Sequence, residues 1–228
     1  MAADPPTRSV PPAAAPAVAH AWSLLALSSI LVFVAAALAL HGLRPELDPV
    51  HSQMSLYLIG AWGPLLQAAY ACLSIGMIAL AVGLRRAMVP ASRSAAPLLL
   101  FVLGGIALTT TAYAWMDLPG LDRTLEGLVH GVSAQAAFLC ATTAMVLQAM
   151  RLRLDPHWRR AWPWLLAWAL ACFASVWGLA LWRDAPRGLA QKAVIALMLG
   201  WLVTACLMLW RRTRVGRPRA APDAGRMR

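Results

Sequence analysis

The sequence contains few acidic residues and almost no lysine. Nine Asp and Glu stand against twenty Lys and Arg among 228 residues, and Lys192 is the single lysine. Charged residues make up 13% of the chain, about half the share usual in soluble domains. The shortage argues against an ordinary soluble domain. The arginines cluster between apolar stretches and in the C-terminal tail, which indicates membrane topology rather than nucleic-acid binding.

Familiar chemical motifs are also missing. The sequence has no Walker loop, no HExxH, no GxSxG elbow and no ring of polar residues at the middle of an apolar stretch. Its four cysteines lie far apart inside apolar stretches, without a CxxC pair, so we expect buried free thiols. They are Cys72, Cys140, Cys172 and Cys206.

Apolar residues are abundant and occur in blocks. They make up 61% of the chain, and a run of roughly 20 residues at 1.5 Å each spans the hydrocarbon core. Continuous runs favour helices over a barrel. We therefore predict an all-α, polytopic integral membrane protein built as a six-helix bundle. The blocks are Ala21–Leu40, Tyr57–Leu84, Ala96–Trp115, Leu128–Met150, Ala161–Leu181 and Lys192–Trp210.

The ends and the second block need separate interpretation. Residues 1–20 are rich in proline and alanine, which predicts a disordered segment before the transmembrane domain at 21–210. Residues 211–228 form a basic tail. We expect the first block to be a retained helix rather than a cleaved signal peptide. Gly60, Gly63 and Pro64 predict a tilt, a kink or a re-entrant turn in the second block.

The positive charges predict the orientation. Fifteen of the twenty Lys and Arg residues fall in the N-terminal segment, the second and fourth connections and the tail. Positive charge collects on the cytoplasmic side, so we expect both termini in the cytoplasm of a bacterial cell and the chain in its inner membrane. The other five are Arg44, Arg123, Arg183, Arg187 and Lys192.

Polar chemistry concentrates on the opposite side, in the three extracytoplasmic connections. In the first, Asp48, His51 and Ser55 can bind a ligand, or Ser55 can cap a helix beside a solvated loop. The six acids on this side are Glu46, Asp48, Asp117, Asp122, Glu126 and Asp184, and the histidines are His41, His51 and His130.

The second candidate cluster joins the third and fourth blocks. Asp117 ends the third block and His130 begins the fourth, so a short hairpin holds them at similar depth. Glu126 shares a helix face with His130, and we expect it to mark the solvated helix end. Ionisable groups inside a membrane usually face the bundle interior, so we expect His130 to turn toward Asp117 and Ser55. An interfacial histidine is the alternative.

The third candidate pair opens the last block. Gln191 and Lys192 enter the membrane from the extracytoplasmic side. Lys192 can extend to the lipid headgroups or pair with Asp117 or Glu126.

These stretches resemble a bacterial six-helix family, the domain of unknown function 998. The matching positions are Ser55 in "DPVHSQMSLY", Asp117, the Gly127-to-His130 run, and Gly188-to-Gln191 followed by Lys192. The chain departs from the family pattern at "AWMD" and at lysine in place of arginine. The resemblance implies a six-helix membrane protein and no established activity.

A more distant similarity to the ceramidase and adiponectin-receptor group suggests an alternative. That group holds zinc with histidines, near a serine and an aspartate. His51, Asp117 and His130 would supply three ligands here, although the last block has no histidine.

Three functions remain open from the sequence. The first is a polar pocket that binds a lipid headgroup, a small solute or a partner protein, with no cofactor expected. The second is a zinc-dependent hydrolase of a lipid amide or ester. The third is a small-solute transporter, which requires a polar path continuing past Gln135 toward the cytoplasm. We expect contact with the lipid bilayer and none with nucleic acid.

Overall fold

The computed structural model describes residues 14–118, 120, 122–182 and 184–215, and this part of the chain is all-helical. Six helices are long and apolar enough to cross a membrane, which confirms the predicted architecture. They are α1 (Ala14–Leu43), α2 (Gly63–Ala87), α3 (Ala96–Tyr113), α4 (Leu125–Leu152), α5 (Trp162–Leu181) and α6 (Arg187–Val215), with short 3-10 helices η1 (Met54–Leu58) and η2 (Pro90–Ser92).

The helix bounds differ from the predicted blocks most in α2, α1 and α6. The second block divides into η1, a turn and α2, so the predicted interruption lies before α2; Gly60 adopts a φ of 96° there. Helix α1 begins at Ala14, well before the predicted start at Ala21, and α6 continues to Val215. Residues 1–13 and 216–228, which include most of the two predicted terminal segments, lie outside the described residues.

Local sequence signals explain where several helices begin. Pro64, Pro97 and Pro163 occupy the first turns of α2, α3 and α5, where a missing N–H costs nothing. Helix α4 has Thr124 as its N-cap, and the Thr124 side chain accepts a hydrogen bond from Gly127 N at 2.9 Å. A threonine hydroxyl at this position satisfies one of the free amides of the first turn.

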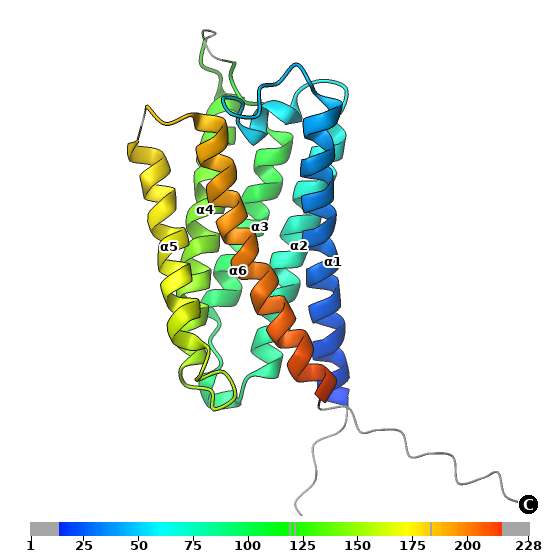
Figure 1. Cartoon of the computed structure of the whole chain (residues 1–228), viewed down its shortest axis with the longest axis vertical. Coiled ribbons are helices and arrows are strands. Elements are labelled where there is room, and N and C mark those ends of the chain that lie inside the picture. The colour runs from blue at the N-terminus through cyan, green and yellow to red at the C-terminus, as the bar shows by residue number, and fades with distance from the viewer. Residues whose placement is uncertain (1–13, 119, 121, 183, 216–228) are drawn as a thin grey trace, which may run out of the picture.

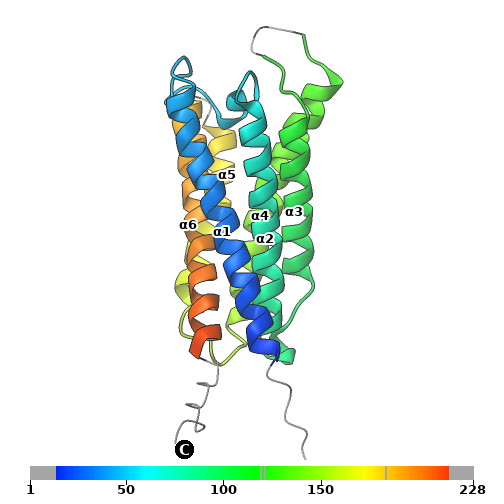
Figure 2. The same cartoon turned by 90° about the vertical axis from the view of Figure 1, so that its right-hand side faces the viewer.

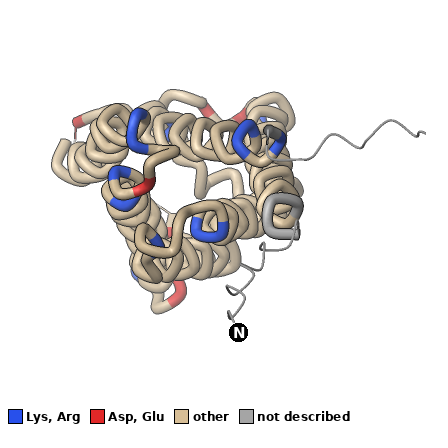
Figure 3. Tube along the Cα trace, turned by 90° about the horizontal axis from the view of Figure 1, so that it is seen from below, with Lys and Arg blue, Asp and Glu red and all other residues tan. Residues whose placement is uncertain are grey.

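The six helices form a ring in sequence order. Each helix packs against the next one, and α6 returns to pack against α1 and also contacts α2 (Figures 1, 2 and 3). We call the end where α1 begins and α6 finishes the termini end. The other end carries connections 44–62, 114–124 and 182–186, and we call it the three-loop end.

Close backbone approaches hold neighbouring helices together. Gly105 lets α2 and α3 meet, and Ser74 Oγ donates to the Gly105 carbonyl at 2.9 Å. Thr109 Oγ1 donates to Ser74 Oγ at 3.1 Å. Helix α6 is tied to α5 by Trp201 Nε1, which donates to Leu165 O at 2.9 Å. Hydrogen bonds between small polar residues are a usual device of membrane helix packing.

Large apolar side chains fill the half of the ring nearer the termini end. Leu80, Leu84, Met145, Trp201 and Leu209 are each at most 1% exposed. These residues come from α2, α4 and α6. Helix α1 contacts the layer where Trp22 lies near Gly83 of α2, and α5 contacts it where Leu165 O accepts from Trp201. The packed layer leaves the interior near the three-loop end as the place where polar side chains can face a cavity.

Candidate functional site

Connection 44–62 folds back onto the first turns of α6. Leu189 N donates to Val50 O at 2.8 Å. Gly188 makes this approach possible, because a Cβ at this position would lie 2.5 Å from Ser52 O and 2.7 Å from Val50 O. The glycine of the "GLAQK" stretch is therefore a packing requirement of the first connection.

Lys192 secures the same connection. Its Nζ donates to Pro49 O at 2.7 Å and to Ser52 O at 2.9 Å. The sequence suggested headgroup contact or pairing with Asp117 or Glu126. The structure pairs the ammonium with two backbone carbonyls rather than with Asp117 or Glu126, so Lys192 supports the site without lining the cavity; headgroup contact stays a prediction.

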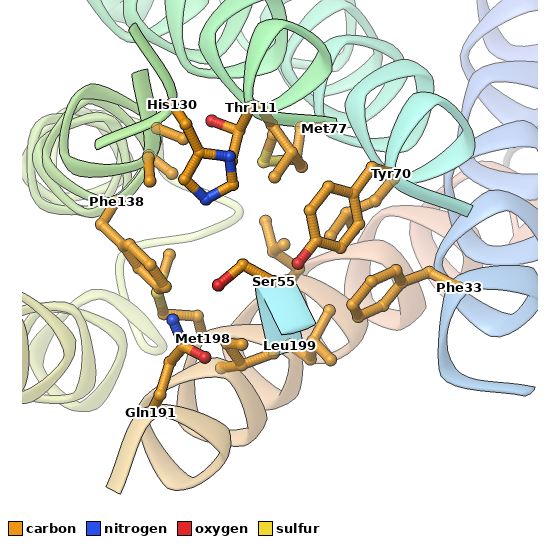
Figure 4. A pocket seen from close by; sticks show the side chains of 17 residues that line it. Phe33, Ser55, Tyr70, Met77, Thr111, His130, Phe138, Gln191, Met198 and Leu199 are labelled. Atoms are coloured by element: carbon orange, nitrogen blue, oxygen red, sulfur yellow. The ribbon is translucent and has the colours of Figure 1, made fainter. Parts of the chain in front are cut away.

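Gln191 joins α6 to η1. Its Oε1 accepts a hydrogen bond from Met54 N at 2.8 Å, which leaves the amide N–H₂ free of that contact. Ser55 follows directly on η1 and is only 7% exposed. Its hydroxyl has no hydrogen-bond partner among the described residues and points into the cavity (Figure 4). Buried polar groups without a protein partner are uncommon and call for an explanation.

His130 lies in the second turn of α4 and is 6% exposed. Its Nδ1 is 2.8 Å from the Ala114 carbonyl oxygen. A carbonyl can only accept, so Nδ1 carries the proton, and in the neutral ring Nε2 keeps its lone pair. Figure 4 shows the imidazole facing the space that Ser55 also faces.

Two adjoining cavities meet at these side chains. The inner chamber has a volume of about 90 Å³ and a mostly apolar lining that includes Phe33, Met77 and Leu202. The vestibule has a volume of about 210 Å³ and includes Gln53 and Arg187 in its lining. The residues that line both cavities form what we call the junction: Ser55, His130, Ala134, Phe138 and Gln191.

The chamber runs deep into the bundle. Met77 and Leu202 lie in the fourth or fifth turn of α2 and α6 counted from the three-loop end, roughly 20 Å inward at 1.5 Å per residue. The fully buried side chains of Leu80, Leu84 and Leu209 follow. The cavity is thus polar near the three-loop end, apolar at its deep end, and closed by packed side chains beyond.

Asp117 lies apart from this cavity. Its carboxylate accepts from Thr124 N at 3.2 Å and from Thr124 Oγ1 at 2.7 Å, and it lies directly against Gly127. It lines a groove of about 860 Å³ on α4, which shares Gly131 and Gln135 with the vestibule but none of the junction residues. The structure therefore brings His130 together with Ser55 but not with Asp117, which braces the start of α4. Glu126 is exposed and accepts from Trp115 N at 3.0 Å.

The three residues of the zinc alternative occupy separate places. The exposed His51 pairs with Asp48, Asp117 pairs with Thr124, and His130 pairs with Ala114 O. Within the described ranges, no group of three or more His, Cys, Asp or Glu side chains gathers as metal ligands would.

The first connection contains two acids, Asp48 and Glu46, whose pKa values are shifted. The hydrogen bond from His51 holds the pKa of Asp48 below its ordinary value, and Arg44 does the same for the pKa of Glu46. Burial raises the pKa of Tyr57, whose ring centroid lies 5.4 Å from Lys192 Nζ. These acids thus lie on the connection itself and not at the junction beneath it.

Two residues that the sequence did not single out belong to the site. Tyr70 reads as a packing residue, yet its hydroxyl points into the chamber beside Ser55 (Figure 4). Arg187 reads as a topology charge, yet it lines the vestibule and donates to Leu179 O at 3.1 Å. Neither has a sequence signal that separates it from its structural role.

Six membrane-length helices closed into a ring define the class, a multi-pass membrane protein with an interior cavity. The chain belongs to the family described as "Protein of unknown function (DUF998)", whose model matches residues 27–208, and the resemblance seen in the sequence is confirmed. The matched range contains Ser55, His130 and Gln191. No curated protein and no solved structure matches the chain.

Proposed function

We propose that this protein resides in the bacterial inner membrane and binds one amphiphilic molecule, a lipid, in the cavity below its three-loop end. The polar part of the ligand occupies the junction, where it meets Ser55, His130 and Gln191. Its hydrocarbon chain occupies the inner chamber. The observation that carries the proposal is the cavity's polarity: unpartnered polar side chains at one end, apolar lining and closure at the other.

The orientation that goes with this proposal places both termini in the cytoplasm. Fifteen of twenty Lys and Arg residues lie on the termini side in the sequence, and Figure 3 draws Lys and Arg on several helices around that end. An alkaline phosphatase fused after Val215, which is active only in the periplasm, should stay inactive. Activity of that fusion would reverse the orientation and move the cavity to the cytoplasmic side.

The two other functions have less support. Transport of a small solute needs a polar path toward the termini end, and the packed layer around Leu80, Met145 and Trp201 stands across it. Zinc-dependent hydrolysis needs gathered ligands, and His51, Asp117 and His130 each have another partner. Lipid binding requires no such rearrangement.

Photocrosslinking tests the binding proposal. The purified full chain in nanodiscs is incubated with hexadecanol that carries a diazirine near the end of its alkyl chain, irradiated and digested for peptide mass spectrometry. We expect adducts on chamber residues such as Met77 and Met198. In Ala137→Phe, which fills the chamber, these adducts should fall about fivefold or more, equivalent to a loss of about 1 kcal/mol of binding.

A matched control distinguishes the cavity from the lipid-facing surface. Val132 lies on the same helix but is 61% exposed, so Val132→Phe adds the same bulk outside the chamber and should leave the adducts unchanged. Adducts confined to exposed residues, or equal in all three proteins, would refute binding inside the chamber.

A further inference from the structure

Three polar groups at the junction have different chemical roles available to them. Ser55 offers a buried hydroxyl, His130 an imidazole nitrogen, and Gln191 an amide N–H₂, and all three line both cavities. Their side chains point toward one shared space (Figure 4). None of these atoms has a hydrogen-bond partner in the described part of the chain, so they are available to a ligand.

His130 is held in the tautomer that a general base requires. Its Nδ1–H donates to Ala114 O at 2.8 Å, and this bond fixes the ring and leaves the Nε2 lone pair toward the cavity. In serine hydrolases an aspartate orients the histidine in the same way. Here a backbone carbonyl of the α3–α4 connection takes that position.

Gln191 is held as a donor. Its Oε1 is occupied by Met54 N at 2.8 Å, so its amide hydrogens are the part left for a ligand. A fixed amide donor next to a nucleophile stabilises the negative oxygen that forms during acyl transfer. The same hydrogen bond fixes η1 and thereby the position of Ser55.

The two cavities hold different parts of a substrate, and these parts are joined at the junction. The apolar chamber, about 90 Å³ in volume, takes the part of an acyl chain nearest the carbonyl, and a polar alcohol enters the vestibule beside Gln53 and Arg187. The carbonyl that joins them then lies beside Ser55, His130 and Gln191. This division matches an ester whose acyl and alcohol parts differ in polarity, because each part meets a lining of its own kind.

We propose that Ser55 and His130 are a nucleophile and base that hydrolyse long-chain esters, with Gln191 as oxyanion donor; this rests on the proposed lipid binding. Ser55 Oγ attacks the carbonyl carbon while its proton passes to His130 Nε2. The carbon–oxygen bond to the alcohol breaks, and the alcohol leaves with that proton. Water, activated in turn by Nε2, cleaves the acyl-serine and releases the carboxylic acid.

No direct hydrogen bond joins the Ser55 hydroxyl to His130. Catalytic hydrogen bonds are often long before substrate binds and shorten in the Michaelis complex. The chamber between them also has to admit the acyl carbon, so a separation that closes around the substrate fits the reaction.

Covalent labelling tests the proposal. The full chain in nanodiscs is treated with a decyl fluorophosphonate, whose phosphorus bonds to an activated serine as fluoride leaves. We expect one adduct per chain on Ser55, mapped by peptide mass spectrometry on the wild-type protein, so the result does not depend on the folding of a variant. Ser55→Ala should abolish it. Ser29→Ala, which removes a buried hydroxyl on α1 outside the cavity, should leave the labelling rate unchanged.

Two further variants assign the other roles. His130→Gln should slow labelling about 100-fold or more, the usual size of a general-base contribution, while His157→Gln at the termini end should not. Gln191→Glu keeps an oxygen for Met54 N but removes the donor. It should slow hydrolysis of p-nitrophenyl decanoate about 100-fold, as expected for one oxyanion donor, with the Ser55 turn still in place.

The outcomes separate this proposal from lipid binding. If the hexadecanol probe labels the chamber but the fluorophosphonate leaves Ser55 unmodified, ester hydrolysis is overturned and binding stands. If neither probe reaches the cavity, both proposals fail. A fluorophosphonate adduct on any other serine, retained in Ser55→Ala, also overturns the assignment of the nucleophile.

Discussion

At the termini end one buried carboxylate is matched by protein groups, whereas at the three-loop end a buried serine and a buried histidine face a cavity. Asp155, with a fully buried side chain, accepts from Val89 N at 2.9 Å and from His157 N at 3.0 Å, and Arg212 Nη1 lies 3.7 Å away. The Arg212 guanidinium also packs over the Trp158 ring, 5.4 Å from its centroid. These contacts join α6 to both connections of that end.

At the three-loop end, the main stabilising contacts are made by the first connection, which covers the cavity. The first connection is pinned to α6 by Leu189 N and Lys192, while Ser55 and His130 below it keep polar atoms free. The difference separates two uses of a buried polar group: Asp155 joins connections, whereas His130 and Gln191 are each held at one atom and keep another toward the cavity. Variants at the two ends should therefore separate stability from binding.

The largest expected effect is the loss of the termini-end carboxylate. Asp155→Ala leaves two backbone amides and the part-buried Arg212 without their acceptor, and removing one partner of a buried ion pair costs about 3 kcal/mol. We expect that decrease in the free energy of unfolding, measured by SDS titration in mixed micelles. Hexadecanol crosslinking in the chamber should be unchanged below the unfolding midpoint.

A stability equal to the wild type would contradict the matched role of this carboxylate. Simultaneous loss of the chamber adducts would contradict the independence of the two ends. Asp184→Asn, an exposed acid at the three-loop end, is the control and should change neither measurement.

The next variant, Gly188→Ala, should lower the free energy of unfolding less than Asp155→Ala but disturb the site more. Gly188→Ala places a Cβ within 3 Å of two carbonyl oxygens of the first connection, and overpacking of this kind costs about 2 kcal/mol. The connection has to move, and with it Ser55. We expect chamber crosslinking and fluorophosphonate labelling to be lost at a temperature where the protein remains folded.

Gly178→Ala is the matched control, because a Cβ at Gly178 meets nothing within 4 Å. It should retain full labelling and equal or slightly higher stability. Normal labelling in Gly188→Ala would show that the contact between α6 and the first connection does not position Ser55.

The helices were predictable because the signal is local. A continuous apolar run of membrane length favours a helix whatever surrounds it, and all six blocks appear as helices. The sequence left the start of α2 undecided between two structures, since Gly60 and Pro64 fit a kink as well as a turn. The hydrogen bond between Met54 and Gln191, 137 positions apart, settles it as a turn, and no local pattern contains that information.

The candidate site was predictable only in part for the same reason. Ser55, His130 and Gln191 stand out as polar residues at the edge of apolar blocks, and the structure brings them to one junction. Asp117 stands out equally, but in the structure it contacts Thr124 and lines the groove on α4 rather than the junction. Tyr70 carries one hydroxyl on a buried ring, which in sequence is indistinguishable from packing.

The smallest expected effect concerns the exposed acid of the first connection. The hydrogen bond from His51 lowers the pKa of Asp48 from its ordinary value of 3.8, so the folded state favours the carboxylate. A lowered folded pKa contributes stability at pH values above the unfolded pKa, and this contribution is lost as the pH falls through the folded value. The unfolding midpoint should therefore drop between about pH 5 and pH 3, by less than in either preceding variant because the pair is exposed. Asp48→Asn, which cannot titrate, should flatten part of that drop, whereas an identical profile would remove the Asp48–His51 pair from the forces that hold the first connection over the cavity.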